Sequence, residues 1–269
     1  MTLRAQGIRT IWPDRPSLVG MIHLLPLPGA PRWGRDMAPV VERALADAEA
    51  LVDAGFNGLM VENYSDVPFH GDSVPPETIA AMTVAGSAVV DAVDVPVGIN
   101  VLRNDAQAAL GIATAIGARF VRVNVHTGAM FTDQGLIEGR AATTLRLRTS
   151  LHADVAILAD VHVKHAVPPA GAALGPSAAD AWHRGLADGL IVSGGGTGDA
   201  TAPSDVEEVR RAVPETPLFI GSGVTAESAA DYLRQADGLI VGSTVMYGGL
   251  AGAGVDPDRA RSFIQAVQG

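Results

Sequence analysis

Three side chains able to transfer a proton or carry charge alternate within ILADVHVKHAVPP at 157–169. Because successive side chains of a β-strand point to opposite faces, a strand ending here places Asp160, His162 and Lys164 on one face. Imidazole titrates near neutral pH, so His162, with Asp160 or Glu62 setting its charge, predicts acid–base catalysis. Lys164 is the only lysine among nineteen lysine and arginine residues. It would stabilise negative charge or, as a free amine, form a Schiff base.

Possible metal ligands lie at the same predicted strand ends. His23, Glu62, Asp160 and His162 are residue types that bind divalent cations. Their spacing matches no compact metal motif, and the chain contains no cysteine, which excludes disulfides and thiolate metal sites. We therefore predict neither a metal nor another cofactor. A structural polar layer inside a barrel is the non-catalytic alternative for these residues.

A regular framework must position these side chains. A β-branched run, a polar or glycine loop and an alanine-rich amphipathic segment recur about eight times, as in parallel βα units. Eight such units in roughly 250 residues predict a single (β/α)₈ TIM barrel over residues 1–269, with 1–16 as an N-terminal extension. A doubly wound open sheet would leave the count of eight unexplained. The predicted strands are 18–24, 58–63, 95–101, 120–125, 155–163, 189–193, 217–221 and 238–242, and the predicted helices are 37–54, 78–93, 105–116, 139–150, 178–186, 204–212, 226–235 and 258–268.

The composition limits the partners and the location. Hydrophobic residues make up 48% of the chain, yet no apolar run approaches the length that crosses a bilayer. Residues 1–16 lack the apolar core of a secretory signal, so we predict a cytoplasmic protein without direct membrane insertion. The net charge of −10 leaves no basic surplus for nucleic-acid phosphates, and no nucleic-acid partner is expected.

The loops that follow the strands of a TIM barrel carry its active site. Polar side chains are dense at these predicted positions, and we predict that they bind a small-molecule substrate. Asp105 has the alternative role of capping the helix that follows it. The predicted substrate-binding residues are His23, Asn63, Asn100, Arg103, Asn104, Asp105, Arg122 and Asn124.

Glycine-rich loops follow the last three predicted strands. Barrels often bind phosphate after strands 7 and 8, where backbone N–H groups of glycine turns point at the anion. The alternative is that these glycines only form tight turns. The predicted phosphate-binding residues are Ser193, Gly196, Thr197, Gly198, Gly221, Ser222, Gly223, Gly242 and Ser243.

Several long motifs identify the chain as similar to the BtpA/SgcQ family from about residue 19 to 267. They are VGMIHLLPLPGAPR at 19–32, ALADAEALVDAGFNGLMVEN at 44–63, DVPF at 66–69, VPVGINVLRNDAQAALGIA at 95–113, FVRVN at 120–124, TGAMFTDQGLIEGRA at 127–141, ILADVHVKHAVP at 157–168, GLADGLIVSGGGTGD at 185–199 and GSGVT at 221–225.

The resemblance implies a barrel of the ribulose-phosphate-binding class, a class whose members are often homo-oligomers. It implies an enzyme that acts on a phosphorylated pentose, or on a nucleoside plus phosphate as a nucleoside phosphorylase does. A pentosyltransferase and a sugar-phosphate lyase or isomerase both fit this expectation. The family name comes from a cyanobacterial protein needed to accumulate photosystem I. The alternative is therefore a non-catalytic assembly or stability factor for a membrane complex such as photosystem I, with a sizeable exposed apolar patch.

One motif departs from the family. After the last strand the family often reads G-[ST]-x-[LF]-K, whereas this chain reads GSTVMYGG at 242–249. Met246 and Tyr247 stand where the lysine is usual. If that lysine holds phosphate, its loss weakens the anion site or changes the substrate.

Overall fold

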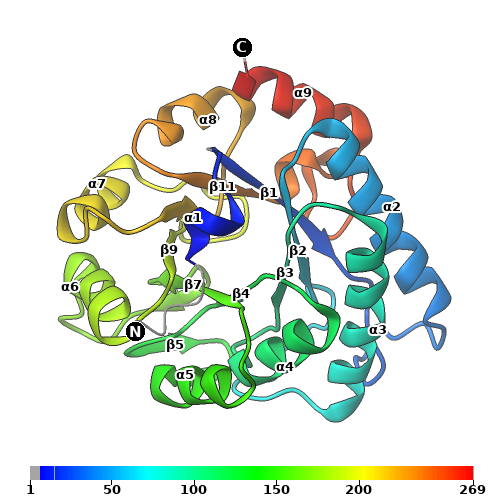
Figure 1. Cartoon of the computed structure of the whole chain (residues 1–269), viewed down its shortest axis with the longest axis horizontal. Helices are drawn as coiled ribbons and strands as arrows, with labels where there is room; N and C mark the ends of the chain where they lie inside the picture. The colour runs from blue at the N-terminus through cyan, green and yellow to red at the C-terminus, as the bar shows by residue number, and fades with distance from the viewer. Residues whose placement is uncertain (1–6, 15, 269) are drawn as a thin grey trace.

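The computed structural model describes residues 7–14 and 16–268. Eight parallel strands form a closed barrel in the cyclic order β1-β11-β10-β9-β7-β4-β3-β2, and helices surround it (Figure 1). The predicted (β/α)₈ barrel is confirmed, and the predicted strands differ from the observed ones only at their ends. The barrel strands are β1 (Ser17–His23), β2 (Gly58–Glu62), β3 (Val97–Asn100), β4 (Phe120–Val123), β7 (Ala156–Val161), β9 (Gly189–Val192), β10 (Leu218–Ile220) and β11 (Gly238–Val241).

The outer helices follow the predicted amphipathic segments. Their apolar faces cover the strands and form the larger core cluster between the two layers. One segment differs from the prediction, since the helix expected at 178–186 begins earlier and continues as a π-helix. The helices are α2 (Ala38–Ala54), α3 (Pro76–Ala92), α4 (Ala106–Ile116), α5 (Ala141–Ser150), α6 (Leu174–Ala179) with the π-helix Asp180–Arg184, α7 (Pro203–Ala212), α8 (Ala226–Leu233) and α9 (Pro257–Gln268).

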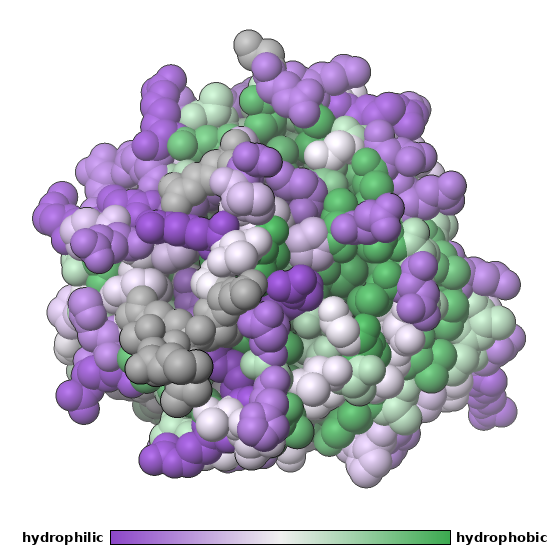
Figure 2. Space-filling view, viewed as in Figure 1, coloured by the Kyte–Doolittle hydropathy of each residue, from purple (hydrophilic) through white to green (hydrophobic). Residues whose placement is uncertain are grey.

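The short helix α1 (Ile8–Ile11) and Trp12 lie across the N-terminal end of the barrel. The Trp12 ring lies 5.1 Å from the ring of Phe120 and 5.9 Å from that of Phe219. Its indole N–H donates to the Asn57 carbonyl at 2.7 Å. These contacts fill the barrel interior with apolar side chains at this end. In the space-filling view of this face, hydrophilic residues gather at the outer rim (Figure 2).

A three-stranded antiparallel sheet was not predicted. It consists of β5 (Ala129–Thr132), β6 (Gly135–Glu138) and β8 (Ala166–Val167), with β5 in the centre. It joins the loop after β4 to the loop after β7 and therefore lies beside the C-terminal ends of two barrel strands. No helix within residues 7–14 and 16–268 has both the length and the apolarity needed to cross a membrane.

Candidate active site

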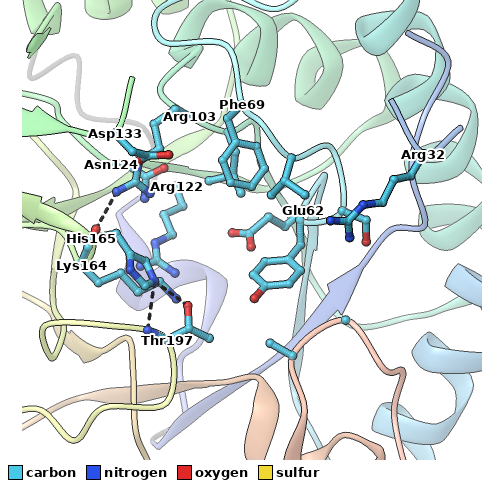
Figure 3. Close-up of a pocket in the computed structure, with 16 residues that line it drawn as sticks. Arg32, Glu62, Phe69, Arg103, Arg122, Asn124, Asp133, Lys164, His165 and Thr197 are labelled. Carbon is cyan, nitrogen blue, oxygen red and sulfur yellow. Dashed lines mark hydrogen bonds between the residues drawn. The ribbon is translucent and has the colours of Figure 1, made fainter. Parts of the chain in front are cut away.

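A cavity of about 640 Å³ opens at the C-terminal ends of the barrel strands. Residues at the C-terminal ends of seven barrel strands, or in the loops that follow them, line it. Glu62 and Lys164 project toward the same space from opposite walls (Figure 3). This is the end of the barrel where the loops were expected to carry function. The polar and aromatic residues that line it are Arg32, Glu62, Tyr64, Ser65, Phe69, Arg103, Arg122, Asn124, Asp133, Lys164, His165 and Thr197.

Arg122 and Asp160 form a buried bidentate ion pair in the floor of the site. Arg122 Nε donates to Asp160 Oδ2 and Nη2 donates to Oδ1, both at 2.8 Å. Asn124 Nδ2 donates to Oδ2 at 3.0 Å, and Ser193 Oγ donates to Oδ1 at 3.3 Å. Burial opposes the charge of Arg122, but the carboxylate of Asp160 outweighs it and raises the pKa of Arg122. Asp160 therefore fixes the guanidinium, and its oxygens have no position left for a second catalytic partner.

His162 does not join Asp160 and Lys164, contrary to the prediction. Strand β7 ends at Val161, and His162 takes a left-handed backbone conformation with φ of 52°. This turn breaks the alternation of side chains and directs the ring to α6, where Nε2 lies 3.0 Å from Ser177 Oγ. Burial lowers the pKa of His162, opposed by two acidic residues of α7. His162 is therefore outside the cavity, and the structure gives it no part in proton transfer with Asp160.

His23 and Glu62 lie next to each other at the ends of β1 and β2. His23 Nδ1 accepts a hydrogen bond from the Gly252 N–H at 3.1 Å, so a neutral ring carries its proton on Nε2, which lies 3.7 Å from Glu62 Oε1. The ring stacks on Tyr64 with centroids 4.2 Å apart. Burial, with the positive charges of Lys164 and Arg122, lowers the pKa of His23 to about 3. His23 is thus a neutral N–H donor at pH 7.

Glu62 is the carboxyl group of the site that is suited to proton transfer. Burial raises its pKa, and the positive charges of Lys164 and Arg122 only partly oppose this effect. A carboxyl group whose pKa moves toward neutral serves as a general acid or base at physiological pH. Glu62 was predicted to be catalytic, and the structure places it against the large cavity and the glycine loops together.

Lys164 is a largely buried cation in the wall between these two spaces. Among residues 7–14 and 16–268, no carboxylate oxygen lies within 4.0 Å of its Nζ. Burial lowers its pKa, and the nearby charge of Arg122 lowers it further. Its backbone carbonyl accepts a hydrogen bond from Arg103 Nη2 at 2.6 Å, which fixes the loop after β7. The ammonium group thus faces the cavity without an anionic partner.

The glycine loops after β9, β10 and β11 meet in a small hollow of about 30 Å³ beside the cavity. Two predicted members lie elsewhere. Ser193 donates to Asp160, and the carbonyl of Gly196 accepts a hydrogen bond from Ser222 Oγ at 2.9 Å. The hollow and the cavity share Glu62, Arg122, Lys164 and Thr197. The predicted phosphate-binding residues that line the hollow are Thr197, Gly198, Gly221, Ser222, Gly223, Gly242 and Ser243.

The predicted substrate-binding residues divide into two groups. Arg103, Arg122 and Asn124 line the cavity, and His23 lines the hollow. The other four hold loops in place through hydrogen bonds. Asn63 Oδ1 accepts from the Leu102 N–H, Asn104 bonds both backbone groups of Val125, Asp105 caps α4 by accepting from the Ala108 N–H, and Asn100 Nδ2 donates to the Arg122 carbonyl.

Several lining residues were not among the predicted site residues. Tyr64 and His165 directly follow predicted members, so their places after the strands were the available signal. His165 Nε2 accepts a hydrogen bond at 3.1 Å from the N–H of Thr197, a predicted phosphate-binding residue, and this bond joins the loops after β7 and β9. Asp133 lies in the unpredicted hairpin of β5 and β6, and no sequence signal pointed to it. Of the two residues that replace the family lysine, Met246 is buried in the barrel interior and Tyr247 is exposed.

Possible metal ligands do not converge. Within the described part of the chain, no three His, Asp or Glu side chains lie close enough together to hold one ion. His162 points to α6, and both oxygens of Asp160 are occupied by other donors. Two of the four candidate ligands are therefore placed for other contacts.

Solved structures of other proteins resemble this chain in fold. Native KDPGal has a TM-score of 0.59 at 15% identity, covering 96% of this chain and 97% of that one. Phosphoribosyl anthranilate isomerase from Thermus thermophilus has a TM-score of 0.58 at 13% identity, covering 93% and 98%. At these identities the likeness shows the fold alone.

Other proteins resemble this chain at much higher sequence identity than these solved structures do. The photosystem I biogenesis protein BtpA of Synechocystis sp. is 47% identical over 250 residues, which cover 93% of this chain and 87% of that protein. A protein of Pyrococcus furiosus, named only as uncharacterised, is 43% identical and covers 92% and 93%. Residues 14–269 match the profile of the BtpA family. The chain belongs to the BtpA family.

Proposed function

We propose that the chain is a cytoplasmic enzyme that binds a phosphate group and acts on a phosphorylated pentose, or on a nucleoside together with inorganic phosphate. The observation that carries this proposal is the unpaired Lys164 ammonium between the cavity and the glycine hollow. A charge out of water is costly unless an opposite charge compensates it. An anionic group of the substrate would supply that charge, with Arg122 beside it.

The glycine hollow is the proposed phosphate position. The first internal hydrogen bond of the turn after β11 is donated by the Val245 N–H to the Gly242 carbonyl. The N–H groups of Ser243 and Thr244 precede it, and such leading donors have no partner within their own turn. Backbone N–H groups of this kind bind anions in glycine loops. Gly242 lines the hollow, and a Cβ at this position would lie 3.6 Å from Met21 Cγ and 3.8 Å from His23 Cε1.

Glu62 is the proposed proton donor and acceptor. In a phosphorylase reaction, a phosphate oxygen would form the bond to the sugar C1′ as the bond from C1′ to the base breaks. Glu62 would protonate the departing base, and Lys164 and Arg122 would stabilise the phosphate charge. His23 Nε2–H would orient Glu62. In a reaction of a sugar phosphate, Glu62 would move a proton on the carbon chain instead.

One activity assay tests both proposed reactions, that of a nucleoside with phosphate and that of a pentose phosphate. Purified chain is incubated with a panel of nucleosides plus inorganic phosphate, and with pentose phosphates, and products are resolved by chromatography. We expect phosphate-dependent release of base, or conversion of a pentose phosphate, and its loss in Glu62→Gln and Lys164→Met. Gly111→Ala, a change on the outer face of α4 with open space around it, is the matched control. Absence of any conversion across the panel by a folded chain that also fails to bind phosphate would overturn the proposal.

A second candidate function rests on one observation. Phe131, Leu136 and Val167 are 53%, 53% and 65% exposed on the small antiparallel sheet, and Phe131 lies between the other two in register. Exposed apolar groups of this kind mark interaction sites. They support a non-catalytic assembly factor for a membrane complex, in line with the name of the Synechocystis relative. A pull-down from membranes that fails for Phe131→Ser/Leu136→Ser but succeeds for Lys164→Met would favour this alternative.

A further inference from the structure

Lys164 is a lysine in a chain that uses arginine at every other cationic position. For holding a phosphate, arginine is the better side chain, because its planar fork bonds two oxygens at once. The ammonium of lysine binds an anion as a point charge only. What lysine offers and arginine does not is an amine that loses its proton and becomes a nucleophile. The choice of residue at 164 therefore favours covalent chemistry of the amine.

The surroundings of Lys164 let its ammonium group lose a proton more readily than an exposed lysine does, so the amine is available for reaction while the resting group carries a charge. Its side chain lines the cavity among two guanidinium groups, those of Arg103 and Arg122. Burial and the charges of Arg122 and Arg103 lower the pKa of Lys164, and the charges of Glu62 and Asp160 oppose this effect only in part. Nucleophilic lysines are activated in this way, by removal from water and by a neighbouring cation. Among the described residues, no carboxylate oxygen forms an ion pair with the amine within 4.0 Å.

The arrangement of the two spaces also leaves room for the carbonyl group of a bound sugar phosphate beside Lys164. The glycine hollow and the large cavity meet at Lys164 and Glu62, which face each other across the opening (Figure 3). A sugar phosphate with its phosphate in the hollow would run its carbon chain past Lys164 into the cavity. Asn124 and Arg103 would face its hydroxyl groups. The hydrogen bond from Arg103 Nη2 to the Lys164 carbonyl, at 2.6 Å, holds the backbone at the point of attack.

We propose that Lys164 Nζ forms an imine with the carbonyl carbon of a phosphorylated sugar in its open-chain form. This inference rests on the proposed function, because the phosphate must occupy the glycine hollow. It names the substrate class within that function as an aldose or ketose phosphate with a free carbonyl. A nucleoside, whose C1′ is not a free carbonyl, would not react with the amine.

Formation of the imine requires neither an oxidant nor a reductant. The lone pair of the neutral amine forms the bond to the carbonyl carbon, and the π electrons move to oxygen, which takes a proton from Glu62. The nitrogen returns its proton to Glu62, giving a neutral carbinolamine. Glu62 then protonates the hydroxyl, which leaves as water while the nitrogen lone pair forms the C=N bond. The products are a protonated imine, ionised Glu62 and one water molecule.

Reductive trapping tests the proposal, and the single lysine makes it unambiguous. The intact chain is treated with sodium borohydride in the presence of ribose 5-phosphate or ribulose 5-phosphate. Ribose 1-phosphate, whose C1 is blocked, is the matched control. We expect a mass increase equal to the sugar phosphate less one oxygen atom, assigned to Lys164 by peptide mapping. The chain's N-terminal amine, the other primary amine, is distinguished by the same map.

Parallel binding measurements separate the two proposals. Thermal shift with each sugar phosphate reports binding whether or not an imine forms. Binding of ribose 5-phosphate or ribulose 5-phosphate without an adduct on Lys164 would overturn the imine and leave the proposed function standing. No binding of phosphate or of any sugar phosphate would overturn both. Lys164→Arg keeps the charge but has no nucleophilic amine, so we expect it to bind these ligands and to give no adduct at position 164.

Discussion

Arg122 and Asp160 are joined by two parallel hydrogen bonds of 2.8 Å, and both side chains are almost fully buried. Their strands are neighbours in the barrel, and Arg122 lies in register with Leu158, two residues before Asp160 on the same face. The carboxylate of Asp160 holds the Arg122 guanidinium group in one position at the floor of the cavity before any ligand binds. Such preorganisation is what an anion site requires.

Breaking this pair is expected to destabilise the fold strongly. Asp160→Asn leaves the Arg122 guanidinium buried without its counter-charge, which costs about 3–5 kcal/mol in comparable cases. Urea denaturation at neutral pH measures the change. The matched control is Arg140→Ala, which breaks the ion pair with Asp72 at 2.7 Å between two half-exposed side chains and is expected to cost at most about 1 kcal/mol. Equal losses for the two variants would show that Asp160 is not the anchor of Arg122.

His23 makes the folded state sensitive to acid. Its pKa falls from 6.5 to about 3 in the folded chain, so between these values the unfolded chain binds more protons than the folded one. Folding stability is therefore lost as the pH falls through this window, by about 3 kcal/mol at pH 4 relative to pH 7.

The measurement for this prediction is denaturant unfolding at a series of pH values. His23→Gln keeps a polar group of similar length but does not titrate, so we expect the acid-dependent loss to shrink by that amount relative to the parent chain. Identical pH profiles for the two proteins would contradict the neutral, buried state of His23. Nitrogen-15 NMR adds a direct check, since the proton should reside on Nε2.

Lys164 is expected to cost stability rather than supply it. The pKa of Lys164 is lower in the folded chain than in the unfolded chain, where it has the ordinary value of about 10.4. At any pH between these two values, the unfolded chain binds more protons than the folded chain. The cost is fully present below this window and disappears as the pH rises through it. Lys164→Met should therefore lose no stability at pH 7, and its advantage should narrow at alkaline pH. A variant that unfolds well below the parent at pH 7 would show that Lys164 is structural.

Gly242 offers a test of the hollow by steric filling. A Cβ there would meet Met21 Cγ at 3.6 Å and His23 Cε1 at 3.8 Å, which are ordinary contacts, so Gly242→Ala should fold. The added methyl group occupies part of a hollow of about 30 Å³. We expect phosphate affinity to fall roughly tenfold, about 1.4 kcal/mol. Gly111→Ala should leave it unchanged, and unchanged affinity in Gly242→Ala would place the phosphate elsewhere.

The barrel was predictable because its signal is repeated. Each strand carries a β-branched run, each helix an amphipathic one, and errors at single boundaries do not change the count. The glycine loops were predictable for the same reason, since their places follow from the strand order. The sheet of β5, β6 and β8 was not, because strands of two to four residues are too short for a periodic pattern to appear.

The site was predictable only in part, because partners depend on register. The alternation of side chains along a strand correctly predicts that Asp160 and Lys164 lie toward the C-terminal end of the barrel. The predicted strand continues through His162, whereas β7 ends at Val161. The backbone takes the left-handed conformation at His162, and nothing in the sequence indicates such a turn at a histidine. That Asp160 pairs with Arg122 requires knowing how β4 and β7 are aligned. Of the residues predicted to be catalytic, Glu62 and Lys164 line the cavity, and His162 does not.

The most direct test of the proposed phosphate site is isothermal titration calorimetry of the parent chain and Lys164→Met with inorganic phosphate at neutral pH. Because Lys164 is proposed to supply an unpaired positive charge to the phosphate, phosphate should bind the parent chain and bind Lys164→Met at least roughly tenfold more weakly. Equal affinity in the two folded proteins, or no binding to the parent chain, would contradict it.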